Sequence, residues 1–387
     1  MSWPTAYLGE LCQINIGRTP SRSVAAYWEE GSHPWLSISD MGKIKEIRYT
    51  SEGITDVAVN DCNMRAVQPG TVLFSFKLSI GKLGIAAVPL FTNEAIASLP
   101  IIDRHILCED YLFHALQEVS GRLVGDRAAM GTTLNKASMA QIQIPLPPLE
   151  EQRRIAAILD KAQDISFRSG LSDQLASSLI ESEMIQRFGR PGKAHADSDL
   201  LSLEGAGVTV IDCPHSTPKW TEQGKICLRT SNLGKGHWIW QDTRRVSDND
   251  FQERARRAHL EPGDIVLSRE GTVGIAAIVH SDMEACMGQR LVQLKLDTSK
   301  LMPEYLLAQL LYLLKPEQIS HAMTGSTSKH INVKDLRELK VFRPPIEDQL
   351  DFENFCASSR KLRARVCMLR QKSDVLGLSI KAASLYS

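Results

Sequence analysis

The chain has 387 residues, too many for one typical domain, so we expect two or three domains. Hydrophobic residues make up 43% and charged residues 23%, an ordinary balance for a globular protein, and 45 basic residues match 45 acidic ones. The lack of a net positive charge argues against a protein that coats DNA by itself. It leaves room for a local basic face or for basic partners on shared DNA.

The cysteines and the N-terminus favour a cytoplasmic protein. The eight cysteines are scattered and none forms a C-x-x-C pair, so neither a zinc site nor a redox motif is indicated. We expect buried free thiols in a reducing compartment. Residues 1–13 lack the basic-then-apolar order of a signal peptide, and no run of about 18 apolar residues could span a membrane.

Residues 1–148 are predicted to form a globular module. Short β-branched runs at 71–76 and 85–88, punctuated by Gly and Pro, indicate strands. Apolar residues at spacings of three and four predict a helix over 109–123. The module is therefore of mixed α/β or α+β class.

A long helix is predicted next, over residues 149–190. Pro147-Pro148 suits the position just ahead of a helix, and Glu150 and Glu151 fall in its first turn, where acids complement the helix dipole. Apolar residues at alternating spacings of three and four predict a coiled-coil seam that shifts phase near Ser169. The seam residues are Ile155, Ile158, Ala162 and Ile165, followed by Leu171, Leu175, Leu179 and Ile185.

The second half of the chain repeats the first, with the same order of landmarks. Thr19-Pro20 returns as Thr217-Pro218, and "QPGTVLFSFKLSIGKLGIAAV" (68–88) returns as "EPGDIVLSREGTVGIAAIV" (261–279). The offsets vary between 190 and 198 residues, so a tandem duplication with variable loops explains the pattern better than a solenoid. A second module is therefore predicted over residues 191–345, with strands at 265–268 and 275–279 and a helix over 303–314.

The duplication extends to the long helix. "PPLEEQ" (147–152) returns as "PPIEDQ" (344–349), so a second long helix is predicted over residues 346–387. Neither helix should be stable alone in water, and each is the nearest partner for the other's seam. The alternative is that each helix packs only on its own module. The predicted seam of the second helix consists of apolar or small residues: Phe352, Phe355, Ser359, Leu362, Val366, Leu369, Ser373, Leu376, Ile380 and Ala383.

The motifs of the common catalytic sites are missing. The chain has no G-x-x-x-x-G-K-[ST] loop for phosphates, no H-E-x-x-H zinc motif, and no Asn/Asp-Pro-Pro-aromatic tetrapeptide of an amino-methyltransferase. No catalytic residue and no metal ligand is therefore predicted. Two variable modules separated by two long helices suit the reading of two things at a fixed distance.

At this point the chain resembles the specificity subunits of type I restriction–modification enzymes. The resemblance lies in "IPLPPLEEQRRIAAILDKA" (144–162), in the "MGTTLNK" and "TGSTSKHIN" segments, in the Pro-Gly and GIAA pairs, and in the duplication itself. It implies two target recognition domains, residues 1–148 and 191–345, separated by two long antiparallel coiled-coil helices, 149–190 and 346–387. Each domain would read half of an asymmetric, interrupted DNA sequence.

The resemblance also implies the partners. Two methyltransferase (M) subunits would dock on the helices and modules and transfer a methyl group from S-adenosylmethionine to adenine. Motor–nuclease (R) subunits, which use ATP and Mg, would join for cleavage. This chain would be a non-catalytic subunit without a cofactor of its own.

Candidate DNA contacts are polar residues in the loops that the two modules share. Base edges are read by Arg, Lys, Asn or Gln, and phosphates by Lys, Arg, hydroxyls or backbone N–H groups beside Gly. For each candidate the alternative is a solvated turn. The first choices are Lys77, Ser79 and Lys82, with Ser268, Arg269 and Thr272 in the second module. The second choices are Thr132, Thr133, Asn135 and Lys136, with Ser326, Thr327, Lys329 and His330.

Two further features of the second module are candidates. Arg229 takes the place of Ser37 in the aligned stretches and is a possible base reader. The run "RARRAH" (254–259) is either a phosphate-binding patch or a solvated helix face.

Three other functions stay open. A related system has a partner in which methyltransferase and nuclease are fused, and the neighbouring genes would distinguish it. A self-contained DNA-modifying enzyme would bind S-adenosylmethionine as an isolated chain. A bivalent scaffold for proteins would show no DNA affinity even with its partner present.

Overall fold

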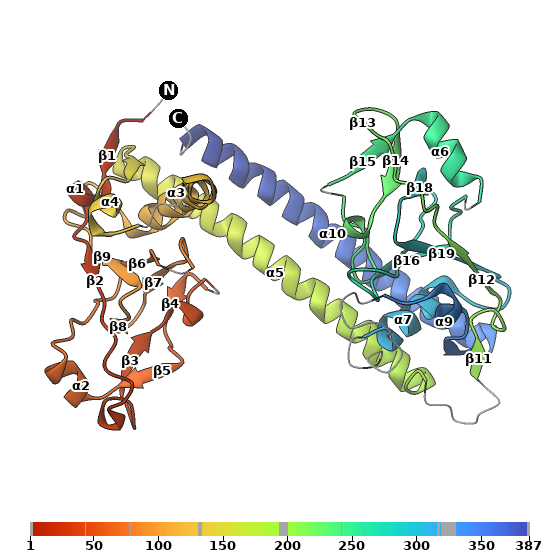
Figure 1. Ribbon diagram of the computed structural model, residues 1–387, viewed down its shortest axis with the longest axis horizontal. Coiled ribbons are helices and arrows are strands. Elements are labelled where there is room, and N and C mark those ends of the chain that lie inside the picture. Colours follow the sequence, from red (N-terminus) through yellow and green to blue (C-terminus); the bar gives the residue numbers. More distant parts are fainter. Residues whose placement is uncertain are drawn as a thin grey trace. The chain divides into compact units, whose positions relative to one another are not determined.

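The computed structural model describes residues 3–42, 44–77, 79–130, 134–192, 200–240, 242–257, 259–315, 318 and 330–384. The chain divides into two compact units (Figure 1). The first unit is Met1–Arg168 with Met368–Ser387, and the second is Ser169–Cys367. Each long helix begins in one unit and ends in the other. Because this division cuts through both helices, it does not test the predicted boundaries between modules and helices, which stay a prediction.

The first unit contains three small sheets. A five-stranded sheet has the order β2-β9-β6-β7-β4, a three-stranded sheet has the order β5-β3-β8, and β1 pairs with β10. The strands are β1 Thr5–Tyr7, β2 Asn15–Ile16, β3 His33–Leu36, β4 Glu46–Ile47, β5 Glu52–Ile54, β6 Val72–Ser75, β7 Leu83–Ala86, β8 Phe91–Thr92, β9 Ile96–Leu99 and β10 Gln143–Pro145. The helices are α1 Leu8–Leu11, η1 Ala25–Tyr27, η2 Ile38–Asp40, α2 Asp56–Asp61, α3 Glu109–Met130 and α4 Lys136–Ala140.

The second unit repeats this topology. Its sheets have the orders β12-β19-β16-β17 and β13-β15-β14-β18, and β11 pairs with β20. The strands are β11 Leu200–Ser202, β12 Val208–Asp212, β13 Trp220–Thr221, β14 Lys225–Leu228, β15 Arg244–Val246, β16 Ile265–Ser268, β17 Ala276–Ile278, β18 Ala285–Met287, β19 Leu291–Leu296 and β20 Lys340–Phe342. The helices are η4 Thr230–Asn232, α6 Asp248–Ala255, α7 Pro303–Leu313 and α9 Val333–Arg337.

The strand pairing confirms the duplication at the level of register. Strand β3 runs parallel to β8 and antiparallel to β5, and its counterpart β14 runs parallel to β18 and antiparallel to β15. Pairing of β4 with β7 corresponds to a single parallel bridge between Lys235 and Ala276. The fold class is the predicted one, a mixed α/β module present twice with two long helices.

The shared Pro-Gly pairs have a conformational cause. Gly70 and Gly263 adopt φ angles of 80° and 93°, a region that favours glycine because it has no Cβ. Their N–H groups donate to the carbonyls of Ala86 (2.8 Å) and Val279 (3.0 Å). Each Pro-Gly turn thereby brings the chain into its central sheet at the same point.

Each unit packs one face of its central sheet against a helix. In the first unit, β6, β7 and β9 bury apolar side chains against α3 and the first turns of α5, Leu149–Phe188. In the second unit, β12, β16, β17 and β19 bury theirs against α7 and the first turns of α10, Ile346–Ser384. The predicted strands and helices in these cores are confirmed, since β6, β7, β16, β17, α3 and α7 overlap them.

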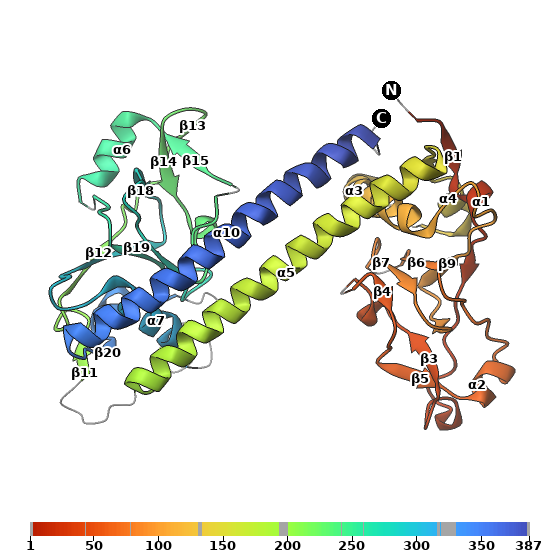
Figure 2. The ribbon, with the colours of Figure 1, turned by 180° about the vertical axis from the view of Figure 1, so that it is seen from behind.

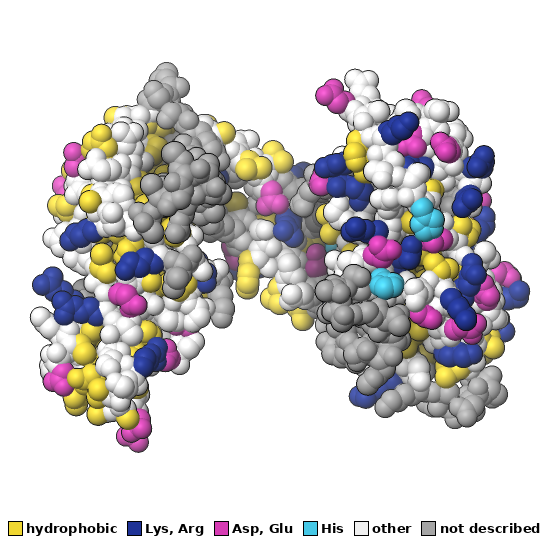
Figure 3. Space-filling view, in the orientation of Figure 1, with side chains coloured by type: hydrophobic (Ala, Val, Ile, Leu, Met, Phe, Trp, Pro, Cys, Tyr) yellow, Lys and Arg dark blue, Asp and Glu magenta, His cyan; other side chains and the backbone are white. Residues whose placement is uncertain are grey.

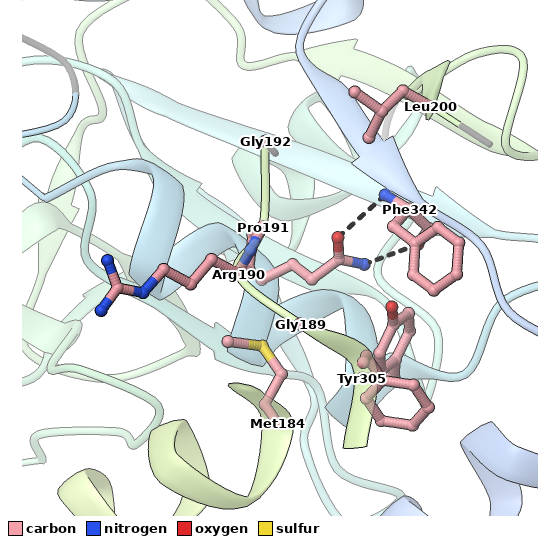
Figure 4. Close-up of a pocket in the computed structure, with 10 residues that line it drawn as sticks. Met184, Gly189, Arg190, Pro191, Gly192, Leu200, Tyr305 and Phe342 are labelled. Carbon is pink, nitrogen blue, oxygen red and sulfur yellow. Dashed lines mark hydrogen bonds between the residues drawn. The ribbon is translucent and has the colours of Figure 1, made fainter. Parts of the chain in front are cut away.

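The end of α5 is closed against the second unit by a tight turn, Gly189–Gly192 (Figure 4). The amide of the buried Gln309 on α7 reaches both backbone groups of Phe342, accepting from N–H and donating to C=O at 2.9 Å each. The pocket beside them has a volume of about 10 Å³, enough for no more than about one water. The turn and its hydrogen bonds therefore stabilise the fold, and the pocket is too small to bind a ligand.

A buried glutamine anchors each long helix to its module. Gln152 donates its amide to the carbonyls of Ile106 and Pro147 at 2.8 Å each, and accepts from the N–H of Cys108 at 3.1 Å. Gln349 donates to Lys300 (3.1 Å) and Pro344 (2.8 Å) and accepts from Met302 (2.9 Å).

Both glutamine side chains are fully buried. The repeated Pro-Pro–acid–acid–Gln sequence therefore contains a latch as well as a helix start, and the latch was missed at the level of sequence.

The helix starts at 149 and 346 are confirmed, but part of the predicted seam is wrong. Leu369 and Leu376 are 60% and 52% exposed, whereas the predicted seam residues Phe352 and Ser373 are buried, and Cys356 and Gly377 are buried beside them. In the first unit, Ser373 Oγ donates to the carbonyl of Ala162 at 3.4 Å. Small residues allow this close approach, and Leu376, one position before the buried Gly377, points outward.

The same correction applies to α5. Ile155 is fully buried, Ile158, Ala162 and Ile165 are half-buried, but Leu171, Leu175 and Leu179 are 46%, 61% and 53% exposed. In α10, Phe355, Val366 and Ile380 are half-buried, and the side chain of Leu362 lies outside the described residues. Figure 2 shows both long helices from behind. In the part of the chain that the structure describes, no helix is long and apolar enough to cross a membrane.

Candidate nucleic-acid interface

The first pair of candidate loops connects β6 to β7 and β16 to β17. Each loop begins at a buried serine on the preceding strand. Ser75 Oγ donates to the carbonyl of Ser79 at 2.6 Å and accepts from the N–H of Lys82 at 2.9 Å, and Ser268 Oγ donates to the carbonyl of Glu270 at 3.2 Å. The predicted DNA contact Ser268 is fully buried, so it holds its loop and does not reach solvent.

The cations of these loops differ in availability. Lys82 Nζ donates to the carbonyl of Ile38 at 2.8 Å, and Arg269, whose side chain is 13% exposed, lies 3.2 Å from Asp212 and 3.3 Å from Glu270. Both side chains therefore stabilise their own units. Lys77 is exposed, with its Nζ 5.5 Å from the ring centroid of Phe76. The exposed polar residues of these loops are Lys77, Ser79 and Thr272.

The second pair of candidate loops is only partly described. Thr132, Thr133, Ser326, Thr327 and Lys329 lie outside the described residues.

Within the described part, Asn135 caps α4 by accepting from the N–H of Ser138 at 2.9 Å, and the next residue, Lys136, is exposed. His330 forms an antiparallel bridge with Glu270, and the N–H of Ile331 donates to the carbonyl of Arg269 at 2.9 Å. The second unit thus brings both of its candidate loops together.

Arg229 is held within its own unit. Its Nη2 donates to the carbonyl of Asp242 at 2.7 Å and lies 2.5 Å from that residue's carboxylate. The hydrogen bond from Arg229 holds the pKa of Asp242 below its ordinary value. Its side chain is 23% exposed, and through its contacts with Asp242 Arg229 fixes the 229–242 segment.

An arrangement of arginine and tryptophan that was not predicted from the sequence follows the Thr-Pro landmark in both units. Arg22 lies 3.8 Å from the ring centroid of Trp28, and Arg244 lies 5.4 Å from that of Trp220. Such contacts are cation–π interactions, and they orient the guanidinium. A tryptophan shortly after Thr-Pro in both halves was the available signal. On the face of each unit that Figure 3 shows, Lys and Arg side chains lie among acidic ones.

Metal binding and thiol reactivity depend on how the His, Cys, Asp and Glu side chains of the described residues are placed. No three described His, Cys, Asp or Glu side chains lie close enough together to hold a metal ion. The seven cysteines whose side chains are described are free, and burial raises the pKa of Cys12 to about 12. A thiol with so high a pKa forms almost no thiolate at neutral pH, so it is inert as a nucleophile.

Comparison with known proteins gives one family. The family model described as "Type I restriction modification DNA specificity domain" matches residues 2–176 and 222–353. The two matched segments contain the central sheet of the first unit, strands β16, β17 and β19 of the second, and the beginnings of both long helices.

Several curated proteins are similar to this chain. The type I restriction enzyme MjaIX specificity subunit of Methanocaldococcus jannaschii is 29% identical over 169 residues, 42% of this chain and 38% of that protein. The MjaVIII specificity subunit of the same organism is 22% identical over 372 residues, 90% of this chain and 83% of that protein. The Escherichia coli EcoR124I/EcoR124II specificity subunit is 28% identical over 186 residues, 45% of this chain and 44% of that protein.

The chain therefore spans less than half the length of two of these three relatives. A solved S subunit of a type I restriction–modification system from M. genitalium has the same fold. Its TM-score is 0.59 at 13% identity, and the match covers 98% of this chain and 95% of that one.

Proposed function

This chain belongs to the type I restriction modification DNA specificity family, and on that premise we propose that it reads a bipartite DNA target for a partner methyltransferase and nuclease. Each module would recognise one half-site. The asymmetric target would then consist of two short specified sequences around a spacer of unspecified base pairs. The protein would act in the cytoplasm, where its DNA and partners are.

The observation that carries this proposal is one topology present twice with different polar loops. The order and pairing direction of the shared strands, the Pro-Gly turns and the glutamine latches are the same in both units, apart from β4 at one sheet edge and β13 at another. The side chains on the matched loops differ: Lys77 and Ser79 are exposed in one, and Thr272 and His330 lie at the corresponding edge of the other. A shared scaffold with divergent donors and acceptors suits two readers of different sequences.

The long helices would set the spacing and bind the partners. A helix of 40 residues rises roughly 60 Å. In the second unit, Leu171, Leu175 and Leu179 form an outer leucine stripe, at intervals of four residues on one exposed face of α5. An exposed row of large apolar side chains marks a protein interaction site. We assign this stripe to a methyltransferase subunit, which would contribute the S-adenosylmethionine; motor–nuclease subunits would contribute ATP and Mg.

The decisive experiment is to express the chain with the methyltransferase encoded beside it and to map methylated adenines across a genome. We expect one bipartite motif. Replacing residues 1–143 with those of a relative should change one half-site and leave the other half-site and the spacer unchanged. A continuous motif, or a swap that alters both halves, would contradict the proposal.

The outer leucine stripe provides a second test. The triple change Leu171→Ser, Leu175→Ser and Leu179→Ser should abolish co-purification of the methyltransferase while leaving the unfolding of the chain nearly unchanged, because the three side chains are exposed. The matched control is Gln174→Ser with Ser178→Ala, at exposed polar positions on the same helix. Undiminished co-purification of the triple variant would exclude this docking site.

A further inference from the structure

A polar cavity lies at the end of α6 in the second unit. It is lined by Pro214, His215, Ser216, Glu253, Arg254, Arg256 and Arg257 and has a volume of about 230 Å³. Pockets for drug-sized ligands have volumes of roughly 300–1,000 Å³, so this cavity suits a smaller group. Its three arginines belong to the "RARRAH" run, for which the sequence left a phosphate patch and a solvated helix face as equal alternatives.

Arg254 builds the inner wall of the cavity. Its side chain is 1% exposed; its Nε lies 3.2 Å from Asp250 Oδ2, and its Nη2 donates to the carbonyl of Ser216 at 3.0 Å. Nη1 is buried and has no hydrogen-bond partner among the described residues. The opposite wall is also fixed, because the carbonyl of His215 accepts from Gln289 Nε2 at 2.7 Å. The cavity is therefore preformed.

The outer charges of the cavity are not neutralised within the described chain. Arg256 and Arg257 are exposed, and neither forms an ion pair with a described residue. Glu253 contributes one carboxylate, and His215 Nε2 lies 3.4 Å from Asp212. Asp250 offsets the charge of the buried Arg254, and the two exposed guanidinium groups outweigh the single carboxylate of Glu253. Planar guanidinium groups suit the oxygens of a phosphate.

The first unit lacks this chemistry at the matched place. Counting back from Pro69-Gly70 and Pro262-Gly263, Asn63 and Met64 stand where the second unit has Arg256 and Arg257. A hydrogen bond joins the helix end to the loop in both units, but the donor lies on opposite sides. In the second unit Arg254 on the helix donates to the loop carbonyl of Ser216, and in the first unit Arg18 in the loop donates to the helix-end carbonyl of Cys62 at 3.0 Å. The contact that closes the fold is thus common to both units, and the exposed arginines are an addition in the second.

We propose that this cavity binds a phosphate group, which on DNA is a backbone phosphate beside the half-site read by the second module. The assignment to DNA rests on the proposed function. Arg256 and Arg257 supply the contacts to the phosphate, and Arg254 acts as a positioning residue that holds them against the 214–216 segment. Phosphate contacts fix a protein's register on the duplex without reading sequence.

The test uses the full chain co-purified with its methyltransferase and the duplex motif found by methylation mapping. Affinity is measured over about 50 to 200 mM salt for the wild type and for Arg256→Gln with Arg257→Gln. The slope of log affinity against log salt is negative, and its magnitude should decrease by about 0.9 for each phosphate that the double variant no longer binds. The double variant should weaken binding to a duplex with either half-site scrambled by the same factor as it weakens binding to the intact motif. The matched control, Lys300→Gln with Lys340→Gln, removes two exposed charges elsewhere in the unit.

A parallel titration with inorganic phosphate, followed by calorimetry, separates the two sources of the group. If the double variant abolishes binding of inorganic phosphate but leaves the salt slope on DNA unchanged, the ligand of the cavity is a free phosphate and the assignment to the DNA backbone is wrong. An unchanged slope together with unchanged phosphate binding would overturn the site. A wild-type complex that binds no duplex would contradict the proposed function instead, and the phosphate titration would still decide the cavity.

Discussion

The two units share a backbone plan but differ in what fills it. Both attach a long helix by a buried glutamine with three hydrogen bonds. Three residues later, the first unit buries Ile155, whereas the second buries Phe352, whose ring centroid lies 6.0 Å from Tyr305 and 5.8 Å from Phe188. The comparison teaches that the attachment was retained after duplication while the packing around it diverged.

The charged groups beside the helices differ in the same way. Asp110 and Glu304 occupy matched positions on α3 and α7, each one residue before a buried tyrosine. Asp110 lies 2.7 Å from Lys45 Nζ, whereas Glu304 lies 2.6 Å from Arg360 Nε on α10. An acid is kept in both units, but one takes its partner from the module and the other from the helix. The charge pairs beside the two helices therefore involve different partners, and their effects on stability can be measured separately in each unit.

Removing the latches tests the common part of the comparison and should have the largest effect. Gln152→Ala and Gln349→Ala should each lower the free energy of unfolding by about 3 kcal/mol, because buried backbone groups lose their partners. We expect the two losses to agree within about 0.5 kcal/mol of each other. Urea unfolding followed by circular dichroism measures both.

The control for the latch is Gln163→Ala, at an exposed glutamine of α5 that bonds only to Gln117 among described residues. Its effect should stay within about 0.5 kcal/mol. Gln152→Glu keeps the shape and the acceptor but loses the two donated hydrogen bonds, so it should also destabilise. A loss in one unit and none in the other would break the equivalence of the two attachments.

The smaller prediction sharpens the difference between the units through pH. Burial raises the pKa of Asp160, but hydrogen bonds from His114 and Lys45 outweigh it, and the net pKa lies below the ordinary 3.8. Its stabilising contribution is present above pH 3.8 and is lost as the pH falls through the lower folded value. Burial raises the pKa of Glu353 above the ordinary 4.5, despite a hydrogen bond from the Glu304 N–H. Its ionised form therefore destabilises the fold at neutral pH.

Asp160→Asn should accordingly be less stable than the wild type at pH 7, and Glu353→Gln equally or more stable. On acidification the difference for Glu353→Gln should vanish first, since Glu353 takes up its proton at the higher pH. Urea midpoints at about pH 7, 5 and 4 measure both series. Differences of the same sign at pH 7 would show that the two acids act alike.

Much of the fold followed from sequence because it depends on local signals. The Pro-Pro pairs, the acids of the first turn and the Gly-punctuated apolar runs are read along the chain, and α5, α10, β6 and β16 begin within a residue of the predicted positions. The candidate DNA contacts were harder. Lys82, Arg229 and Arg269 are donors of the expected type, but each is taken by a carbonyl or carboxylate brought from a distant part of its unit.

By itself the sequence determined the duplication, the class of the modules and the starts of the two long helices, because repeats, prolines and apolar spacing act over a few residues. Only the tertiary structure decided which face of each helix is buried. Ser373 and Gly377 permit a closer approach to Ala162 than leucine does, so Leu376 faces solvent. Only the tertiary structure, likewise, placed Arg254, Arg256 and Arg257 around one cavity with the 214–216 segment, about 40 residues earlier in the chain.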